Sequence, residues 1–184
     1  MPEIFVTSDT FFGRPSIIDI ADRPFSSVDD MNLALIENWN KQVGPKDIVY
    51  HLGNFAWNPV IAEEVLKQLH GKIYLIKGEY DDAVESVVKH FINKLHILPD
   101  SMLKDNTLKC VLSHWPLANW PGRYNGIYHL HGQTLNSMKT DLDIMNRVNM
   151  CTDNWNFTPQ PLIETLNMLK KRGEKQQNTL GSEE

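Results

Sequence analysis

Short apolar runs alternate along this chain with longer segments in which apolar residues recur at helical spacing. The short runs hold four to seven residues each and are bounded by turn residues. Their length and their content of Val, Ile and Tyr favour β-strands. The predicted strands are residues 3–8, 47–52, 72–78, 95–98, 101–104, 108–113, 126–132 and 147–152.

The segments between the first strands each present one apolar helical face. The three faces are Met31, Leu35, Trp39 and Val43; Ile61, Val65 and Leu69; and Val84, Val87, Val88, Phe91 and Ile92. A final helix is predicted over 159–172, which begins with prolines and ends with cations. The β-α-β-α-β beginning and the later hairpin-like strands predict an α/β fold, parallel at first and mixed later.

The composition fits a single globular domain. The chain has 184 residues, of which 41% are hydrophobic and 22% are charged, so residues 1–172 can bury a sizeable core. Residues 173–184 are polar and lack aromatic side chains, and we expect this C-terminal tail to be disordered. Cys110 and Cys151 lie in apolar, strand-like surroundings, which favours buried reduced thiols over a disulfide framework.

Charge and hydropathy narrow the function classes. The net charge is −5 and no block of Lys and Arg is present, so a nucleic-acid partner is unsupported. Nowhere do 18 apolar residues run together. We therefore expect neither a signal peptide nor a membrane partner, and a cytoplasmic location.

Polar side chains follow five of the predicted strands at the point where each strand ends. They are Asp9; Asn54; Glu79, Tyr80 and Asp81; His114; and His131 and Gln133. In open α/β sheets, functional groups gather beyond the carboxyl ends of the strands. The sequence therefore predicts that these side chains meet on one rim.

Eight short blocks connect this rim to a known superfamily. They are "SDTFFGR" (8–14), "RPF" (23–25), "ENWN" (37–40), "DIVYHLGNFA" (47–56), "GEYD" (78–81), "SHWP" (113–116), "HGQTL" (131–135) and "WNFTP" (155–159). In this order they resemble the calcineurin-like metallophosphoesterases, particularly the small phage and bacterial branch, over residues 3–165. The resemblance implies a four-layer αββα sandwich of two mixed β-sheets flanked by helices. It also implies two metal ions, about 3.5 to 4 Å apart, that polarise a phosphate ester and generate hydroxide from bound water.

The resemblance breaks down at the residues that would carry the chemistry. Only Asp9 and His114 keep the expected residue type. The changed positions are Phe11, Gln133 and Leu135, each in place of a histidine; Asn54, in place of the bridging aspartate; Glu79, in place of an asparagine; and Tyr80, in place of the histidine that assists the leaving group. We interpret these eight positions as a vestigial site without a catalytic residue. Tyrosine, with an unperturbed pKa of about 10 against about 6.5 for histidine, is a poor proton donor near neutrality.

The two metal positions implied by the resemblance are affected differently. The first would use Asp9, Phe11, Asn54 and Leu135, of which two have no donor atom, so we expect it to be empty. The second would use Asn54, Glu79, His114 and Gln133. Each of these has a donor atom, and the set could hold one Mg²⁺, Mn²⁺ or Ca²⁺ ion.

Three hypotheses follow. The first is a catalytically inactive homologue that acts as a binding, scaffold or inhibitor protein, with another protein as its partner and no cofactor. The second is a phosphoesterase with the altered single-metal site, and the third is a binder of a nucleotide or phosphate that does not hydrolyse it. The contacts to a ligand or partner would come from Arg14, Trp115, Trp120, Arg123 and Tyr124.

Each of these residues could instead have a purely structural role. The aromatic residues and Arg123 of the 115–126 loop could instead pack the loop down, and Arg14 could sit in solvent. His114 could be a packed rim histidine and Glu79 a solvated loop carboxylate. His129 and His131 are interpreted as structural, because they alternate with apolar residues in a strand.

Overall fold

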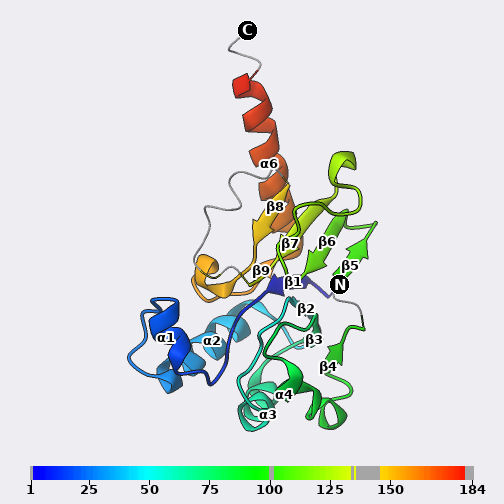
Figure 1. The fold of residues 1–184 in the computed structure, drawn as a ribbon. Coiled ribbons are helices and arrows are strands. Elements are labelled where there is room, and N and C mark those ends of the chain that lie inside the picture. Colours follow the sequence, from blue (N-terminus) through cyan, green and yellow to red (C-terminus); the bar gives the residue numbers. More distant parts are fainter. Residues whose placement is uncertain (1, 100–101, 134, 136–145, 181–184) are drawn as a thin grey trace.

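The computed structural model describes residues 2–99, 102–133, 135 and 146–180. Two mixed β-sheets lie at the centre of the chain, with helices on their flanks (Figure 1). This confirms the predicted α/β class with two mixed sheets flanked by helices. No helix in these described ranges is long and apolar enough to cross a lipid bilayer.

The first sheet has the strand order β4-β3-β2-β1-β9. Its strands are β1 (Ile4–Thr7), β2 (Ile48–His51), β3 (Lys72–Leu75), β4 (Leu95–Ile97) and β9 (Gln160–Pro161). Strands β1 to β4 are parallel, and β9 runs antiparallel to β1. The parallel direction of the first strands was predicted from the alternation of apolar strands with helical segments.

The second sheet has the order β5-β6-β7-β8. Its strands are β5 (Met102–Asp105), β6 (Cys110–Ser113), β7 (Tyr128–His131) and β8 (Arg147–Asn149). The β5-β6 pair is an antiparallel hairpin, and β6, β7 and β8 are parallel. The turn of the hairpin is closed by Asp105, whose Oδ1 accepts hydrogen bonds from the backbone N–H groups of Thr107 and Leu108.

The helices are α1 (Ser16–Ile20), α2 (Val28–Gln42), α3 (Pro59–Gln68), α4 (Asp82–Glu85) and α6 (Leu162–Leu180), with 3₁₀ turns at Val88–His90, Arg123–Asn125 and Thr152–Trp155. Helix α2 begins after Ser27 and α3 after Asn58, and each of these side chains accepts a hydrogen bond from an N–H in the first turn. Both capping residues therefore define where a core helix starts.

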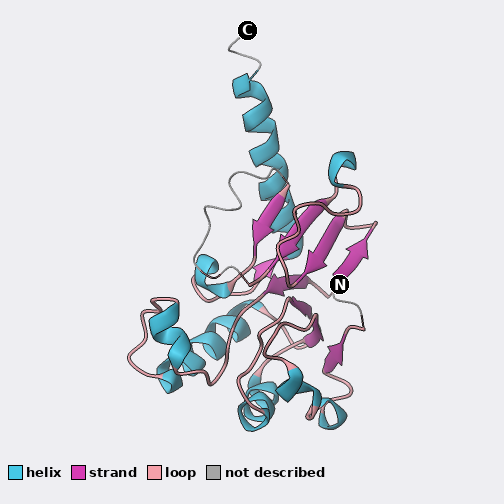
Figure 2. Ribbon diagram, in the orientation of Figure 1, coloured by secondary structure: helices cyan, strands magenta, loops and turns pink. Residues whose placement is uncertain are grey.

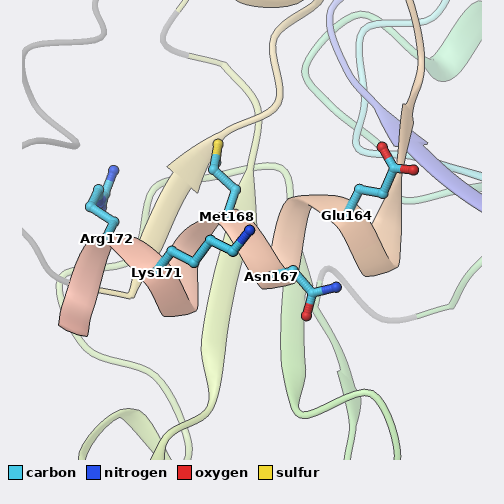
Figure 3. A pocket seen from close by; sticks show the side chains of 5 residues that line it. All are labelled: Glu164, Asn167, Met168, Lys171 and Arg172. Carbon is cyan, nitrogen blue, oxygen red and sulfur yellow. The ribbon is translucent and has the colours of Figure 1, made fainter. Parts of the chain in front are cut away.

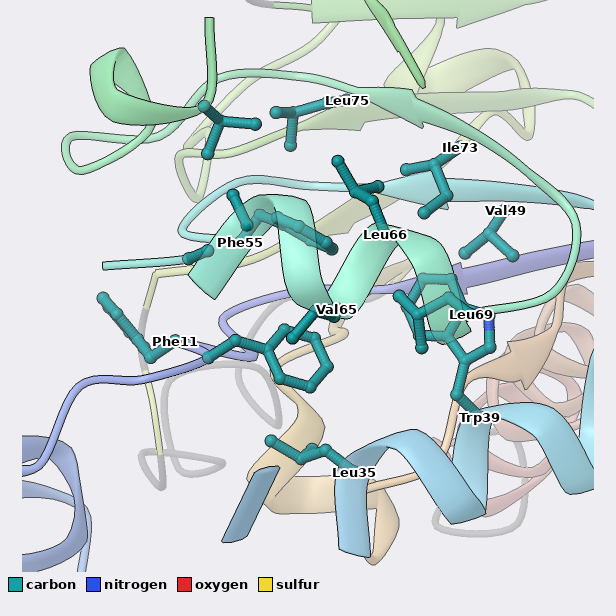
Figure 4. Close-up of a cluster of buried hydrophobic side chains, with 14 of the residues drawn as sticks. Phe11, Leu35, Trp39, Val49, Phe55, Val65, Leu66, Leu69, Ile73 and Leu75 are labelled. Atoms are coloured by element: carbon teal, nitrogen blue, oxygen red, sulfur yellow. The ribbon is translucent and has the colours of Figure 1, made fainter. Parts of the chain in front are cut away.

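Two apolar cores hold the layers together. One lies between the first sheet and helices α2 and α3, where Trp39, Val65 and Ile73 are buried (Figure 4). The other joins the opposite face of the first sheet to the second sheet and α6, and contains Val6 and Leu130. Because successive strand residues face opposite sides, Phe5 belongs to the first core and Val6 to the second.

Two predicted helices differ in extent from the prediction. The apolar face at 84–92 forms only the short α4 and a 3₁₀ turn, in keeping with the low helix propensity of three valines within five positions. The last helix begins at Leu162 rather than at position 159, because Gln160–Pro161 form β9, and it continues past Arg172 to Leu180. Residues 173–180, where we expected disorder, are thus helical, and their Glu, Lys and Gln residues are good helix formers. Figure 2 shows that α6 extends beyond the second sheet. Residues 181–184 lie outside the described part.

Candidate functional site

The strand register brings the predicted rim residues together. Thr7 lies opposite His51, which lies opposite Leu75, so β1, β2 and β3 end at the same level. The second sheet joins this rim through a bridge between Ser8 and Cys151. The loops after β1, β2, β3 and β7 consequently surround one cavity.

This cavity has a volume of about 170 Å³. It is lined by Asp9, Phe11, Arg14, Ile17, Ile20, Asn54, Glu79, Tyr80, Gln133 and Leu135. Seven of the eight vestigial positions are among these residues. The eighth, His114, lies behind Asn54, with its Nε2 3.4 Å from Asn54 Nδ2.

A larger hollow, of about 630 Å³, lies elsewhere along α6. It is lined by Glu164, Asn167, Met168, Lys171 and Arg172, all from that one helix (Figure 3). No polar groups from different elements converge there among its lining residues, and such convergence is what distinguishes a ligand site. The smaller cavity at the strand ends is therefore the candidate functional site.

Asn54 occupies the centre of the polar side of the cavity. Its Nδ2 donates a hydrogen bond of 2.8 Å to Oδ1 of Asp9 and lies 3.4 Å from Nε2 of His114. Its Oδ1 accepts from the backbone N–H of Tyr80 at 3.3 Å. The carboxamide thus presents its nitrogen, a hydrogen-bond donor, to Asp9 and His114.

His114 is held by the backbone. Its Nδ1 lies 2.6 Å from the carbonyl oxygen of Leu52. Since a carbonyl oxygen only accepts, Nδ1 carries the proton and Nε2 is left as an acceptor that faces Asn54. Gly53 allows this close packing, because its φ is +102° and a Cβ there would lie 2.4 Å from Nδ1 of His114.

Asp9 is a fully buried carboxylate with several donors. Besides Asn54, the backbone N–H of Gln133 donates to its Oδ2 at 2.7 Å, and the Ser8 hydroxyl contacts the same oxygen. Burial raises the pKa of Asp9, while the neighbouring His114 ring and these hydrogen bonds oppose the rise. The protein's own donors therefore occupy both oxygens.

The opposite side of the cavity is apolar. Phe11 is buried and belongs to the core between the first sheet and helices α2 and α3, and half-buried Leu135 packs against the same core. Figure 4 shows Phe11 among the residues of that core. Two of the four residues that the resemblance assigns to the first metal position, Phe11 and Leu135, thus contribute only carbon atoms.

These residues do not fit a two-metal centre. Phe11 and Leu135 have no donor atom, and Asn54 turns its oxygen toward the Tyr80 backbone. Among the described residues, no group of three or more His, Cys, Asp and Glu side chains is arranged to hold a metal ion. Glu79 is exposed in its loop. Hydrogen bonds therefore do not hold the proposed ligands of a second metal, which are Asn54, Glu79, His114 and Gln133, around one point.

The backbone of the cavity has an unusual conformation. Ten non-glycine residues in the described ranges have a positive φ, and half of them line this cavity. They are Asp9 (57°), Phe11 (50°), Asn54 (59°), Gln133 (69°) and Leu135 (41°). Asp and Asn tolerate this region, whereas a left-handed conformation costs other residues about 1 to 2 kcal/mol. The loops around the cavity therefore hold Phe11, Gln133 and Leu135 in this conformation in spite of its cost.

Two buried side chains keep the rim loops in place. Asp81 accepts hydrogen bonds of 2.7 to 2.8 Å from the backbone N–H groups of Asn54, Phe55 and Gly78. Burial raises the pKa of Asp81, and these bonds oppose the rise. The loops after β2 and β3 are joined through this one carboxylate.

Arg23 holds the loop after β1 in place. It donates to the carbonyl oxygens of Asp9 and Thr10 at 2.7 and 2.9 Å, and forms a two-point ion pair of 2.8 Å with Asp153. Sequence reasoning noted Arg23 only within the "RPF" block and missed Asp153. The signal that could have predicted a partner was the position of Arg23 beside an apolar segment. An arginine buried there requires a carboxylate partner.

Arg14 lies at the mouth of the cavity among aromatic rings. Its guanidinium carbon is 4.8 Å from the ring centroids of Phe11 and Trp57 and 4.5 Å from that of Tyr80. Its Nε donates to the Ser16 hydroxyl at 3.2 Å. Of the alternatives for Arg14, the structure favours a place at the cleft. The sequence did not single out Trp57, because it directly follows the block at 47–56 and belongs to none of the motif positions.

The loop at 115–126 is mostly packed on itself. Trp120 is buried and donates from Nε1 to the carbonyl oxygen of Ile127 at 2.8 Å. Arg123 stacks on Trp120 and donates to the carbonyl oxygen of Ala118 at 2.6 Å. Both residues are thus packed within the loop, and their assignment as partner contacts stays a prediction. Tyr124 and Trp115 are exposed, and neither lines the cavity.

The strand histidines have structural partners. In His129, Nδ1 lies 3.3 Å from the carbonyl oxygen of Val111, and Nε2 accepts from the N–H of Leu117 at 3.1 Å. Burial, followed by the neighbouring His131, lowers the pKa of His129 to about 3. His129 is thus a neutral, hydrogen-bonded core histidine, as predicted.

The fold and its rim define an α/β protein with a polar cleft beyond its strand ends. No family model matches the chain. It is 30% identical over 178 residues to the uncharacterized protein MJ1445 of Methanocaldococcus jannaschii, covering 93% of each chain. The chain therefore belongs to the same family as MJ1445.

Solved structures place the fold. A protein of unknown function from Aquifex aeolicus, AQ665, aligns with a TM-score of 0.67 at 21% identity, over 91% of this chain and 100% of the other. The nuclease MPE of Pseudomonas putida aligns over 71% of this chain and 59% of its own, at 14% identity and a TM-score of 0.44. The first likeness establishes the shared fold, and the second is too low to carry an argument.

Proposed function

We propose that this protein is a catalytically inactive metallophosphoesterase homologue that acts as a binding or scaffold protein. One observation carries the proposal. The amide nitrogen of Asn54 lies between Asp9 and His114, so the acceptor atoms that would face a cation face an N–H donor instead. An amide that donates to a carboxylate satisfies it without a metal, and it cannot bridge two ions as an aspartate does.

The apolar side of the cavity supports the same proposal. Phe11 and Leu135 keep a left-handed backbone in spite of its cost. Strain of this kind persists where the surrounding structure over-determines it, commonly at functional sites. A site shaped to present ligands, now carrying side chains without donor atoms, is what loss of the original chemistry would leave.

The size of the cavity bears on the choice of ligand. Its volume of about 170 Å³ is below the range of about 300 to 1,000 Å³ for pockets that hold small-molecule ligands and cofactors. A cavity of this size would enclose only a small part of a nucleotide. The volume suits a single side chain, which favours another protein as the partner over the nucleotide-binding alternative.

The test measures metal content and phosphodiester hydrolysis on the same sample. After incubation with Mn²⁺, Mg²⁺ or Ca²⁺ and dialysis, elemental analysis should find no stoichiometric metal, and bis(p-nitrophenyl) phosphate should not be turned over. A variant with Phe11→His, Asn54→Asp, Glu79→Asn, Tyr80→His, Gln133→His and Leu135→His should gain both properties. Turnover by the unaltered protein that disappears in His114→Ala but persists in the control His96→Ala would overturn the proposal.

A second candidate function is a phosphoesterase with one metal ion. It is favoured by His114, whose Nδ1 is fixed on a backbone carbonyl so that Nε2 is the acceptor that faces Asn54, and a fixed Nδ1 is typical of metal-binding histidines. For Asn54 to become a ligand, its amide would have to turn and give up its bond to Asp9. Stoichiometric binding of one ion, lost in Glu79→Gln, would support this candidate over the first.

A further inference from the structure

Arg14 is a preorganised but unused hydrogen-bond donor. Three rings contact its guanidinium group, and Nε is fixed on the Ser16 hydroxyl. Within the described part of the chain, its two terminal amino groups have no hydrogen-bond or ion-pair partner. An arginine that is already held in place loses little side-chain freedom when it binds an oxyanion through both amino groups.

The charge of Arg14 is not compensated inside the cavity. Arg14 is the one basic residue among the described lining residues. Glu79 lines the same cavity, but the structure shows no ion pair between them in its described ranges. The Asp9 carboxylate is already bound by Asn54 and Gln133. The mouth of the cavity therefore offers a free cation to an incoming acceptor.

The surface around Arg14 has the composition of a protein-binding hot spot. Ile20 is 58% exposed, Trp57 42% and Tyr80 37%. The rings of Trp57 and Tyr80 lie 5.6 Å apart, and the backbone N–H of Trp57 is anchored on the carbonyl oxygen of Phe12 at 2.9 Å. Trp, Tyr and Arg carry a large share of binding energy at protein interfaces, particularly around a pocket.

We infer that this surface, made of Arg14, Ile20, Trp57 and Tyr80, docks a segment of a partner protein that carries an acidic side chain next to an apolar one. The carboxylate accepts hydrogen bonds from the two amino groups of Arg14. The apolar side chain packs on Trp57 and Tyr80, and one side chain enters the cavity that Ile20 lines. A free phosphate would use Arg14 but would leave the exposed apolar residues uncovered. The inference rests on the proposed binding role and names its partner class.

The test uses short random linear peptides displayed for selection on the immobilised full-length protein. The selected peptides should share an Asp or Glu beside an apolar residue. A synthetic peptide of that consensus should bind in fluorescence anisotropy and lose about tenfold or more in affinity when its acid is replaced by the amide. Arg14→Gln should cause a similar loss, and Arg14→Lys most of it, since lysine lacks the two-point fork.

Arg123→Gln is the matched control, because Arg123 also stacks on rings but lies outside the cavity. It should leave the affinity unchanged. A selection without consensus, a basic or purely apolar consensus, or binding insensitive to Arg14 would overturn the inference. So would inorganic phosphate binding to the protein where no peptide does. Because metal content and hydrolysis are measured separately, failure here would leave the proposed loss of catalysis standing, and turnover by the unaltered protein would refute that proposal independently.

Discussion

Replacing Asn54 with aspartate tests the central feature of the site most directly. The substitution keeps the shape of the side chain but puts a carboxylate oxygen where an amide nitrogen now donates to Asp9 at 2.8 Å. Two charges at this separation repel by about 6 kcal/mol at an effective dielectric constant of about 20. The hydrogen bond would become a like-charge contact inside the protein.

The protein can avoid this repulsion by binding a proton. Protonating a carboxyl with an unfolded-state pKa of about 3.9 costs about 5 kcal/mol at about pH 7.5 and about 1.5 kcal/mol at about pH 5. Since protonation costs less than the repulsion, it sets the loss of stability. The folded-state pKa of the new pair lies above its unfolded value, so stability is retained at low pH and lost as pH rises.

Urea unfolding of Asn54→Asp should therefore give a deficit of about 5 kcal/mol near pH 7.5 that shrinks to about 1.5 kcal/mol near pH 5. The larger value is comparable to the whole stability of many domains, about 5 to 15 kcal/mol, so the series should start at the acidic end. Addition of Mn²⁺ should recover part of the deficit, since a cation satisfies both carboxylates.

Asn58→Asp is the matched control. It makes the same amide-to-acid change at the N-terminus of α3, where the Asn58 oxygen accepts from the N–H of Ile61. A carboxylate keeps that bond and is favoured by the helix dipole, so the control should be neutral or slightly stabilised. If Asn54→Asp matched this control at every pH, the donor role of Asn54 would be wrong.

Three further predictions concern the support of the site. Arg23→Met leaves Asp153 buried without its partner and should cost about 3 to 5 kcal/mol in urea unfolding, whereas a loss below about 1 kcal/mol would mean that the ion pair contributes little. The folded-state pKa of His129, about 3, lies below its unfolded value, so stability is lost as pH falls from about 6.5 toward 3. Between about pH 7.5 and pH 5 the unaltered protein should therefore lose about 2 kcal/mol more stability than His129→Gln. Equal losses in the two proteins would contradict this. Gly53→Ala should prevent folding, because a Cβ there meets a buried imidazole nitrogen at 2.4 Å, while Gly126→Ala, with open space around it, should lower stability by only about 1 kcal/mol in thermal unfolding.

Much of the fold follows from local pattern. Alternating apolar runs and helical faces predicted helices α2 and α3 and the strands of both sheets except β9, which lies in the segment predicted as the start of the last helix, because these elements bury whole faces whose residues recur at fixed spacing. The pattern overestimated the helix at 84–92, where the valines reach the core without a long helix. It also ended the last helix too early, since a polar segment of good helix formers needs no apolar face to continue.

Some features of the candidate site likewise follow from the sequence, and others depend on the tertiary structure. That Phe11 and Leu135 cannot bind a metal is a property of their atoms, and it holds whatever surrounds them. That Asn54 donates to Asp9 and Arg14 lies among Phe11, Trp57 and Tyr80 depends on loops brought together from distant parts of the chain.

Residue identity thus establishes that Phe11 and Leu135 bring no donor atom to the cleft, because donor atoms are present in a side chain or they are not. How the other side chains of the cleft are arranged is decided by packing. An amide can present oxygen or nitrogen, an arginine can face solvent or rings, and a carboxylate such as Asp153 can be exposed or paired with an arginine 130 positions away. Each choice is made by the neighbours that the tertiary structure supplies, since a hydrogen bond requires its partner within about 3 Å.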